Sequence, residues 1–524
     1  MKNTFKKFAG IAAASIMAAS MVAPMAMNFT ASAASVTIEG LDATVERTFE
    51  VYQVFTGTYD SATGTFSALK WGEGVSTYDS AAVTPGELVA ADIITNLGTD
   101  ARAIAKKIVT STTKTTVTSD AASLTINGLT DGYYFIKDVT DLDGKHDANS
   151  AFIVQVAADA ASPTITIKKD QPKIDKLVQD ETGDAEEGAD ANGWGESADH
   201  AINEQFQFKL VAEIPNNADL KYYDTYKLVF NDTMSAGVTF DGIASVTVAE
   251  TATDAYTETA TEGAAGQTWS LTLNDIKAIA GDKFGAETFT VEVVYNAHLN
   301  ENAIVDDNSR AGGTLGDTNC NYVDLQFSNN PDNTGTGATD GKNDLGQTEK
   351  DYVWVYTYEL NNKKYKIEVK DGNELEGAEF QLLSGGTAVK LIDNGDGTYT
   401  VADQNATDGF VTTMVSNASG IFDIKGLDAG DYVLHETDAP DGYNVAQDVN
   451  ISIGATHKEQ TGTTVDLTLT GIGEGVENSI VDTMNNTLPS TGGVGTTLFY
   501  LGGGAMVAVA GVYLISKKRM KNED

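Results

Sequence analysis

Cysteine is almost absent from this chain of 524 residues, in which Cys320 is the only one. A single cysteine excludes an intramolecular disulfide, and we expect its thiol to be buried or merely tolerated. Proline is also scarce, with 8 residues against 51 glycines. Together with plentiful Thr, Val and Tyr, this composition favours many short strands joined by turns.

Basic residues are few as well: 34 Lys and Arg stand against 75 Asp and Glu, which gives a net charge of −41. We therefore expect no nucleic acid or anionic lipid as partner, because phosphates would be repelled. The 5 histidines are scattered singly, and no nucleophile elbow or phosphate loop is present. These absences argue against an enzyme and predict neither a metal nor a cofactor.

The first 33 residues are typical of a secretion signal. Lys2, Lys6 and Lys7 precede an apolar run over residues 8–27, and Ala31-Ser32-Ala33 supplies small residues at the spacing that signal peptidase accepts. We expect residues 1–33 to be removed and the mature chain to start near Ala34.

The C-terminal residues 488–524 contain three segments in a fixed order: Leu488-Pro489-Ser490-Thr491-Gly492, an apolar stretch over residues 497–515, and a basic cluster over residues 517–521. The apolar stretch is about long enough to span a bilayer, and the basic cluster would keep its end in the cytoplasm. This order resembles the cell-wall sorting signal of Gram-positive surface proteins. The resemblance implies that a sortase cysteine attacks the Thr491 carbonyl, releases Gly492 onward and passes Thr491 to an amine.

Between these ends, composition and loop-like stretches suggest three units, over residues 34–170, 171–350 and 351–487. Alternating strands dominate the last two units, and we expect a mainly β protein of tandem immunoglobulin-like sandwiches. In the first unit, residues 49–55 and 132–137 have the character of strands. Residues 84–109 predict one or two helices, because Pro85 and acidic residues come early and Lys106-Lys107 come late.

The third unit carries two motifs, over residues 375–380 and 430–443, that resemble the collagen-adhesin B-type (Cna-B) domain. That family forms an internal Lys–Asn isopeptide bond with a glutamate as catalyst, which the resemblance places at Glu436. It puts the lysine in the opening strand and the asparagine in the closing strand. We expect Lys364 and Asn485 to be joined, with Lys366 and Asn486 as alternatives because they satisfy nearly the same pattern.

Such a bond needs the reacting side chains to meet in an apolar core. Burial disfavours an ammonium and leaves a nucleophilic amine, while it keeps a carboxyl protonated so that the carboxyl can donate to the amide carbonyl. Alternation places Glu436 on the same face as Tyr432 and Leu434. The simpler interpretation, a solvated lysine and glutamate, is therefore less favoured.

The second unit resembles the middle domain of Gram-positive major pilins, through residues 223–234 and 323–331. That family uses an aspartate as catalyst for its isopeptide bond. Three residues of the required types keep phase with apolar neighbours on their strands, and we assign Lys176 as nucleophile, Asp232 as catalyst and Asn329 as acceptor. Asn330 remains an alternative to Asn329, and the sequence does not show whether the first unit has a bond of its own.

Together these features resemble the shaft subunit of a sortase-assembled pilus, a secreted and wall-anchored protein. Residues 165–172 resemble the region that carries the linking lysine, although they lack its aromatic residue and its Tyr-Pro. We expect Lys168, or its neighbour Lys169, to accept Thr491 of another subunit. Expected partners are pilin-specific and housekeeping sortases, copies of this chain, peptidoglycan or a basal pilin, a tip pilin and an unidentified host ligand. The alternative is a wall-anchored adhesin for host matrix or glycan that does not polymerise.

Overall fold

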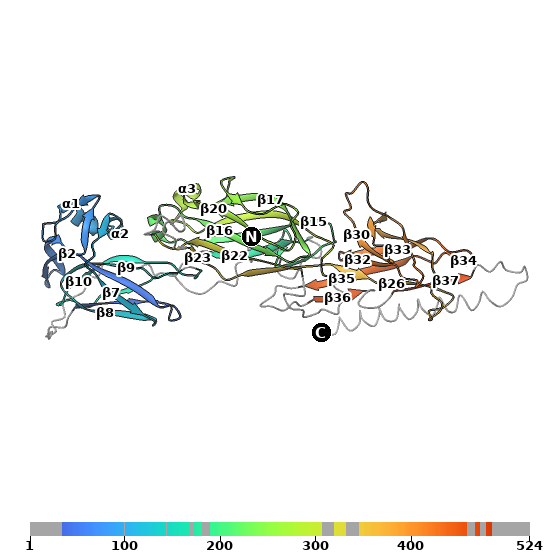
Figure 1. Cartoon of the computed structure of the whole chain (residues 1–524), viewed down its shortest axis with the longest axis horizontal. Helices are drawn as coiled ribbons and strands as arrows, with labels where there is room; N and C mark the ends of the chain where they lie inside the picture. Colours follow the sequence, from blue (N-terminus) through green and yellow to red (C-terminus); the bar gives the residue numbers. More distant parts are fainter. Residues whose placement is uncertain are drawn as a thin grey trace, which may run out of the picture.

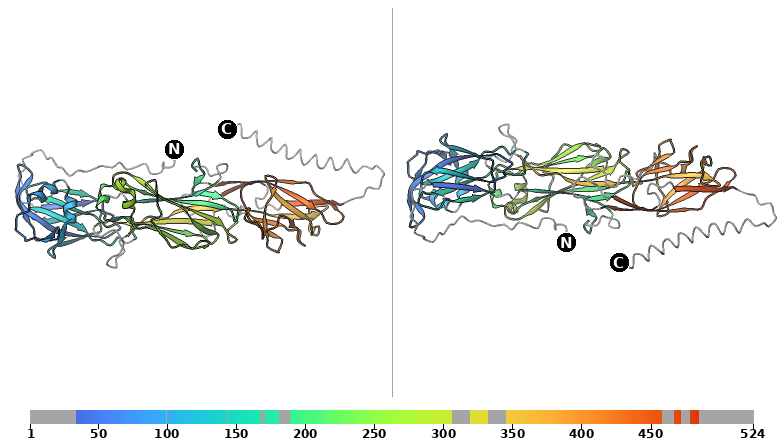
Figure 2. Two further views of the ribbon diagram at one scale, coloured as in Figure 1. Left: turned by 90° about the horizontal axis from the view of Figure 1, so that it is seen from above. Right: turned by 90° about the horizontal axis from the view of Figure 1, so that it is seen from below.

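The computed structural model describes residues 34–98, 100–142, 144–167, 171–180, 189–305, 319–331, 345–457, 467–471 and 478–484. They form three β-rich domains that follow one another in a row, so that the described chain makes an extended rod (Figures 1 and 2). No helix in these ranges is long and apolar enough to cross a membrane.

The first domain contains three sheets with the strand orders β10-β9-β2-β3, β11-β1-β8 and β5-β4-β6, and β7 pairs with β2. Its strands are β1 (Ala34–Glu39), β2 (Arg47–Asp60), β3 (Thr65–Trp71), β4 (Val75–Tyr78), β5 (Ala81–Ala82), β6 (Ile108–Thr110), β7 (Thr115–Ser119), β8 (Ser123–Leu129), β9 (Gly132–Asp138), β10 (Ala151–Val156) and β11 (Thr164–Thr166). Two short helices, α1 (Ala91–Leu97) and α2 (Ala101–Lys106), lie where helices were predicted. The side chain of Asp100 caps α2 by accepting from the backbone N–H of Ala103.

The second domain is a sandwich of two sheets, ordered β13-β12-β15-β21-β17-β18 and β14-β24-β22-β16-β20-β19, with β23 paired to β22. Its elements are β12 (Lys173–Gln179), β13 (Trp194–Gly195), β14 (Ser197–Asp199), β15 (Gln205–Ile214), η2 (Ala218–Tyr222), β16 (Leu228–Met234), β17 (Val238–Val248), β18 (Thr251–Ala252), β19 (Thr257–Glu258), β20 (Thr268–Leu273), α3 (Ile276–Ala280), η3 (Gly281–Lys283), β21 (Phe289–Leu299), β22 (Asn319–Ser328), β23 (Leu345–Gln347) and β24 (Asp351–Tyr356). Every second side chain of β15 and β21 is buried, so both strands turn one face to the shared core.

The third domain has sheets ordered β25-β32-β30-β29, β28-β27-β33-β35-β36 and β26-β37-β34, and β31 pairs with β27. Its strands are β25 (Tyr358–Leu360), β26 (Asn362–Lys366), β27 (Glu379–Ser384), β28 (Thr387–Ala388), β29 (Leu391–Asp393), β30 (Thr398–Val401), β31 (Met414–Val415), β32 (Asp423–Leu427), β33 (Gly430–Asp438), β34 (Tyr443–Asn444), β35 (Val449–His457), β36 (Leu467–Gly471) and β37 (Asn478–Met484). The parallel pairing of β26 with β37 joins an opening strand of the domain to its last described strand.

One domain limit differs from the sequence analysis. Residues 351–356 were assigned to the third unit, but β24 pairs with β22 and β14 in a sheet of the second domain. The third domain therefore begins after Tyr356, with β25. The mainly β architecture and the helices in the first domain agree with the prediction.

The first two domains meet through a loop of the first domain that follows β9. Gly144 donates its backbone N–H to Leu345, and Lys145 accepts one from Gln347, so the loop lies against β23. The ring of His146 packs edge-on against Phe327, with 5.9 Å between the ring centroids. These contacts set the position of the first domain relative to the second.

Candidate cross-linking sites

Two lysines differ from all others in the described ranges, because only Lys176 and Lys364 are buried. Lysine is almost never fully buried unless it is paired, since removing an ammonium from water is costly. One of the two lies in the second domain and the other in the third. Each lies at the centre of a cluster of polar groups.

In the second domain, Lys176 lies on β12, and its side chain is buried in the core between the two sheets. Its Nζ contacts the carboxylate of Asp232 on β16 and donates to the hydroxyl of Tyr295 on β21, at 3.0 Å. All three residues are fully buried. The rings of Phe208 and Tyr295 lie 5.0 and 5.3 Å from Nζ and close the site from water.

The fourth member of this cluster is Asn321 on β22. Its Nδ2 donates to the Tyr295 hydroxyl at 2.7 Å, and that hydroxyl donates to Asp232 Oδ2 at 3.2 Å. Asn321 is fully buried too. The amine of Lys176, the carboxyl of Asp232 and the carboxamide of Asn321 thus all form hydrogen bonds with the Tyr295 hydroxyl, inside an apolar core.

The environment shifts this cluster toward its uncharged forms. Burial lowers the pKa of Lys176, against the opposing effect of Asp232. Burial likewise raises the pKa of Asp232, although Lys176, Tyr295 and Asn321 act in the other direction. A neutral amine next to a protonated carboxyl is the state that amide exchange requires.

Asn329, which the sequence analysis assigned as acceptor, is not at this site. Its Nδ2 donates to the backbone carbonyl of Leu142 in the first domain at 3.2 Å. Its backbone carbonyl accepts from the backbone N–H of Asn149, also in the first domain. Asn321 lies in β22 and Asn329 directly follows its last residue, Ser328, in the same phase of alternation, so alternation could not separate them. The strand register distinguishes the two asparagines. β22 runs antiparallel to β16, with Val323 opposite Asp232 and Asn321 opposite Met234. Asn330 follows Asn329 at the same end of the strand.

In the third domain, Lys364 on β26 lies between two carboxylates. Its Nζ is 2.9 Å from Glu436 Oε2 on β33 and also contacts the carboxylate of Asp482 on β37. All three are buried, and Phe380 lies 5.2 Å from Nζ. Lys366, the alternative lysine, is only half-buried.

Burial raises the pKa of Glu436, and the charge of Asp482 acts in the same direction, against the hydrogen bond from Ala446 and the effect of Lys364. The backbone N–H of Ala446 donates to Glu436 Oε2 at 2.6 Å and fixes this carboxyl in place. The raised pKa favours the protonated form of Glu436, which can then act as an acid.

Asp482 was missed because the sequence analysis looked for an amide in the closing strand. It alternates with the buried Ile480, which was the available signal. Asn485, Asn486, Lys168, Lys169 and the pentapeptide at residues 488–492 lie outside the described residues. Their assigned roles stay predictions.

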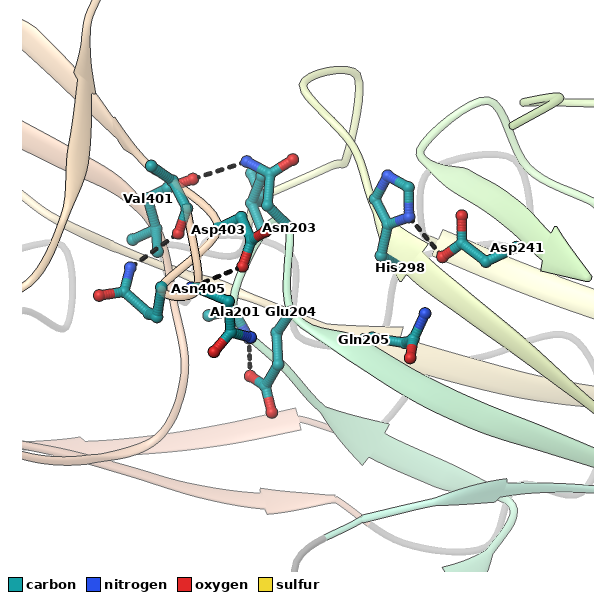
Figure 3. A pocket seen from close by; sticks show the side chains of 12 residues that line it. Ala201, Asn203, Glu204, Gln205, Asp241, His298, Val401, Asp403 and Asn405 are labelled. Atoms are coloured by element: carbon teal, nitrogen blue, oxygen red, sulfur yellow. Dashed lines mark hydrogen bonds and ion pairs between the residues drawn. The ribbon is translucent and has the colours of Figure 1, made fainter. Parts of the chain in front are cut away.

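The junction between the second and third domains holds a depression of about 830 Å³ (Figure 3). Asn203 crosses this junction and donates from Nδ2 to the carbonyl of Val401 at 2.8 Å. On the second-domain side, His298 Nδ1 pairs with Asp241 Oδ2 at 2.6 Å. Across the described residues, His, Cys, Asp and Glu nowhere gather in a set of three that could hold a metal.

Two family matches cover the end of the chain. Residues 358–468 match the SpaA family, described as a prealbumin-like fold domain. Residues 480–524 match the LPXTG cell wall anchor motif, and the protein is therefore a secreted, cell-wall-anchored surface protein. No curated protein sequence matches the chain.

Among solved structures, the chain is similar to the T6 backbone pilin of serotype M6 Streptococcus pyogenes, with 18% identity, coverage of 88% of this chain and 100% of that one, and a TM-score of 0.50. The major pilin SpaD of Corynebacterium diphtheriae shares 17% identity over 87% of this chain and 99% of its own, with a TM-score of 0.45. BcpA, the major pilin subunit of Bacillus cereus, shares 16% identity over 86% of this chain and 99% of its own, with a TM-score of 0.40. The chain thus joins an LPXTG anchor and a prealbumin-like SpaA domain to the fold of a three-domain backbone pilin.

Proposed function

We propose that this protein is the shaft subunit of a covalently polymerised, wall-anchored pilus that supports adhesion and colonisation. The observation that carries the proposal is the pair of buried lysines. Lys176 contacts Asp232 and is connected to Asn321 through the hydroxyl of Tyr295, and Lys364 contacts both Glu436 and Asp482, inside a chain with a single cysteine. The three-domain fold and the anchor motif support the same function.

In the second domain we assign the bond to Lys176 and Asn321. The neutral Lys176 Nζ attacks the Asn321 Cγ while protonated Asp232 donates to the carbonyl oxygen. A new N–C bond replaces the bond from Cγ to Nδ2, and ammonia leaves with the one proton that the amine releases. The product is a neutral amide, so the core no longer contains a buried amine that could become charged.

In the third domain we assign the bond to Lys364 and Asp482, with Glu436 as acid. Here Lys364 Nζ, as the free amine, attacks the carboxyl carbon of Asp482 in its acid form. Glu436 protonates the departing hydroxyl so that water leaves instead of ammonia, and the proton that the amine loses returns to Glu436. The two residues are 118 positions apart in the sequence. By analogy with disulfides, closing such a loop contributes up to about 5 kcal/mol, against roughly 0–1 kcal/mol for an exposed ion pair.

Each site would react once per molecule, so we propose that the chain is a substrate of sortase and not an enzyme with turnover. Lys168 remains the assigned amine for Thr491 of the next subunit, with Lys169 as its alternative. Further proposed partners are peptidoglycan or a basal pilin at the wall and a tip pilin at the other end. A wall-anchored adhesin that never polymerises is the competing function.

The internal bonds are tested by intact mass and peptide mapping of the secreted chain. We expect a mass below that of the processed sequence by one ammonia and one water, and branched peptides that join Lys176 to Asn321 and Lys364 to Asp482. Asp232→Ala should restore the ammonia alone, and Glu436→Ala the water alone. A mass equal to that of the processed sequence would refute both bonds.

Polymerisation is tested separately, by blotting the wall fraction of the native organism. The wild-type chain should form a ladder of high-molecular-weight species that contains a branched peptide between Thr491 and Lys168 or Lys169. Thr491→Ala should be secreted but neither anchored nor polymerised. A single wall-linked band without a ladder would favour the adhesin.

A further inference from the structure

The hydroxyl of Tyr295 contacts every group that the second-domain bond requires. It accepts from Lys176 Nζ at 3.0 Å and from Asn321 Nδ2 at 2.7 Å, and it donates to Asp232 Oδ2 at 3.2 Å. A phenol oxygen has one proton to donate and two lone pairs to accept with, so these three contacts use its full capacity. Tyr295 is fully buried, on the central strand β21 of its sheet.

The two atoms that the phenol joins are the ones between which a proton must move. Lys176 Nζ gains a positive charge when it attacks Asn321 and must then lose a proton. Asn321 Nδ2 must gain one, because an amide anion is too poor a leaving group to depart. Both nitrogens point their N–H groups at the same oxygen, so one atom bridges donor and acceptor of the transfer.

The carboxyl of Asp232 contacts Lys176 and Tyr295 through Oδ2 alone, which leaves Oδ1 for a different role. Within the described residues, no hydrogen-bond donor contacts Asp232 Oδ1 or Asn321 Oδ1. A buried oxygen without a partner is costly, and a proton on Asp232 that bridges to the Asn321 carbonyl would satisfy both. Asp232 would then polarise the carbonyl, and the leaving nitrogen would need another source for its proton.

We propose that Tyr295 is a catalytic residue of this bond, as the proton relay from Lys176 to the leaving nitrogen of Asn321. The inference rests on the proposed Lys176–Asn321 bond. In the tetrahedral adduct Nδ2 is an amine nitrogen whose lone pair can accept a proton. As the adduct collapses, Lys176 Nζ passes a proton to the phenol oxygen, and the phenol proton turns from Asp232 Oδ2 to this lone pair on Nδ2. The Cγ–Nδ2 bond breaks, ammonia leaves, and Tyr295 ends with the proton count with which it began.

The third domain has a different arrangement, which fits its different acceptor. Two carboxylates, Glu436 and Asp482, contact Lys364 there. A departing hydroxyl of Asp482 can take its proton directly from Glu436. The carboxamide acceptor of the second domain releases a more basic nitrogen, and the Tyr295 hydroxyl is hydrogen-bonded to that nitrogen.

The test follows bond formation in the full chain after a short pulse of synthesis in a host without sortase, by mass spectrometry of the Lys176–Asn321 peptide. We expect Tyr295→Phe to form this bond about 10²–10⁴-fold more slowly, the range for general acid–base groups. The Lys364–Asp482 bond of the same molecules should be unaffected and serves as an internal control. Tyr226→Phe, which removes another buried phenol of the same core, should form both bonds at the wild-type rate.

A solvent isotope effect separates a relay from a positioning role. In D₂O the wild-type bond should form more slowly, and Tyr295→Phe should lose this slowing. A wild-type rate in Tyr295→Phe would overturn the inference. So would an isotope effect that persists in the variant, or, if the variant does not fold, the absence of an isotope effect in the wild type. If the wild type lacks the Lys176–Asn321 bond altogether, the proposed function has failed at this site, and the relay fails with it.

Discussion

Arg47, at the start of β2, and Asp138, at the end of β9, form a buried ion pair with 2.5 Å between Arg47 Nη1 and Asp138 Oδ2. Nη2 of Arg47 contacts Asp147, which lies in the loop that packs against the second domain. The described part of the first domain has no buried lysine, and Arg47 is the buried basic side chain of its core. It ties the core strands to the junction.

Arg47→Ala should therefore destabilise the first domain by about 3–5 kcal/mol, because it leaves two carboxyls buried without their partner. Hydrogen exchange of the β2 and β9 amides would measure this loss. Lys107→Ala is the matched control, since it removes an exposed ion pair with Asp79 and should cost at most about 1 kcal/mol. Equal exchange in the two variants would contradict a stabilising role for Arg47.

The sequence indicated the architecture because its local patterns are strong. Alternation over β15 and β21 and the capped helix α2 of the first domain are local features, and local chemistry determines them. Alternation also put Lys176 and Asp232 on apolar faces, and both are buried. The limit after Tyr356 was missed because β24 pairs with strands distant in sequence.

The acceptors could not be deduced in the same way. Asn321 and Asn329 are equivalent by alternation, and only the register of β22 against β16 distinguishes them. Asp482 was excluded by the assumption that the acceptor must be an amide. Tyr295 carried no motif, and its position depends on three strands meeting around one hydroxyl. Register and convergence are properties of the tertiary fold.

A second prediction concerns the junction of the second and third domains. Gly426 has φ of +82°, and a Cβ added there would lie 2.6 Å from Cδ1 of Ile202. Ile202 also donates its N–H to the Gly426 carbonyl at 3.0 Å. Gly426→Ala should loosen this contact and add about 1–3 kcal/mol of overpacking to the backbone strain. Faster exchange of the Ile202 amide and a broader interdomain distribution by small-angle scattering would report it.

Gly442→Ala provides the matched control for this variant. Gly442 has φ of +94°, but a Cβ added there would meet no other atom within 4 Å. Gly442→Ala should lower the free energy of unfolding only by the cost of a left-handed backbone, about 1 kcal/mol, without any change at the junction. If both variants loosen the junction equally, the packing of Ile202 on Gly426 is not what holds the two domains.

A third prediction concerns pH. Burial lowers the pKa of His200, but its ion pair with Glu204 and its hydrogen bond to the Gln179 carbonyl outweigh this, and the pKa lies above its usual value. For Glu204 burial raises the pKa, yet the pairing with His200 leaves it below its usual value. The stabilisation from His200 is full below about pH 6.5 and is lost as pH rises through the folded pKa. That from Glu204 is lost as pH falls through its lowered pKa.

The free energy of unfolding should therefore contain a contribution that is largest between these two pKa values. His200→Gln keeps a donor for the Gln179 carbonyl but removes the titrating charge. Subtracting its pH profile from that of the wild type should give a curve that declines toward both acid and alkali. A flat difference curve from about pH 4 to about pH 9 would show that the His200–Glu204 pair contributes nothing measurable.

The last prediction identifies the acceptor in the third domain by a coincidence of mass. An amide from Lys364 to Asp482 is the same chemical group as one from Lys364 to an asparagine at that position, since one reaction releases water and the other ammonia. Asp482→Asn should therefore give a cross-linked chain with the mass of the cross-linked wild type, although the two sequences differ in mass. Asp482→Ala should retain the full mass of its own sequence in this domain. A bonded Asp482→Asn chain that still differs from the wild type by the substitution would show that Lys364 is joined elsewhere, as at Asn485.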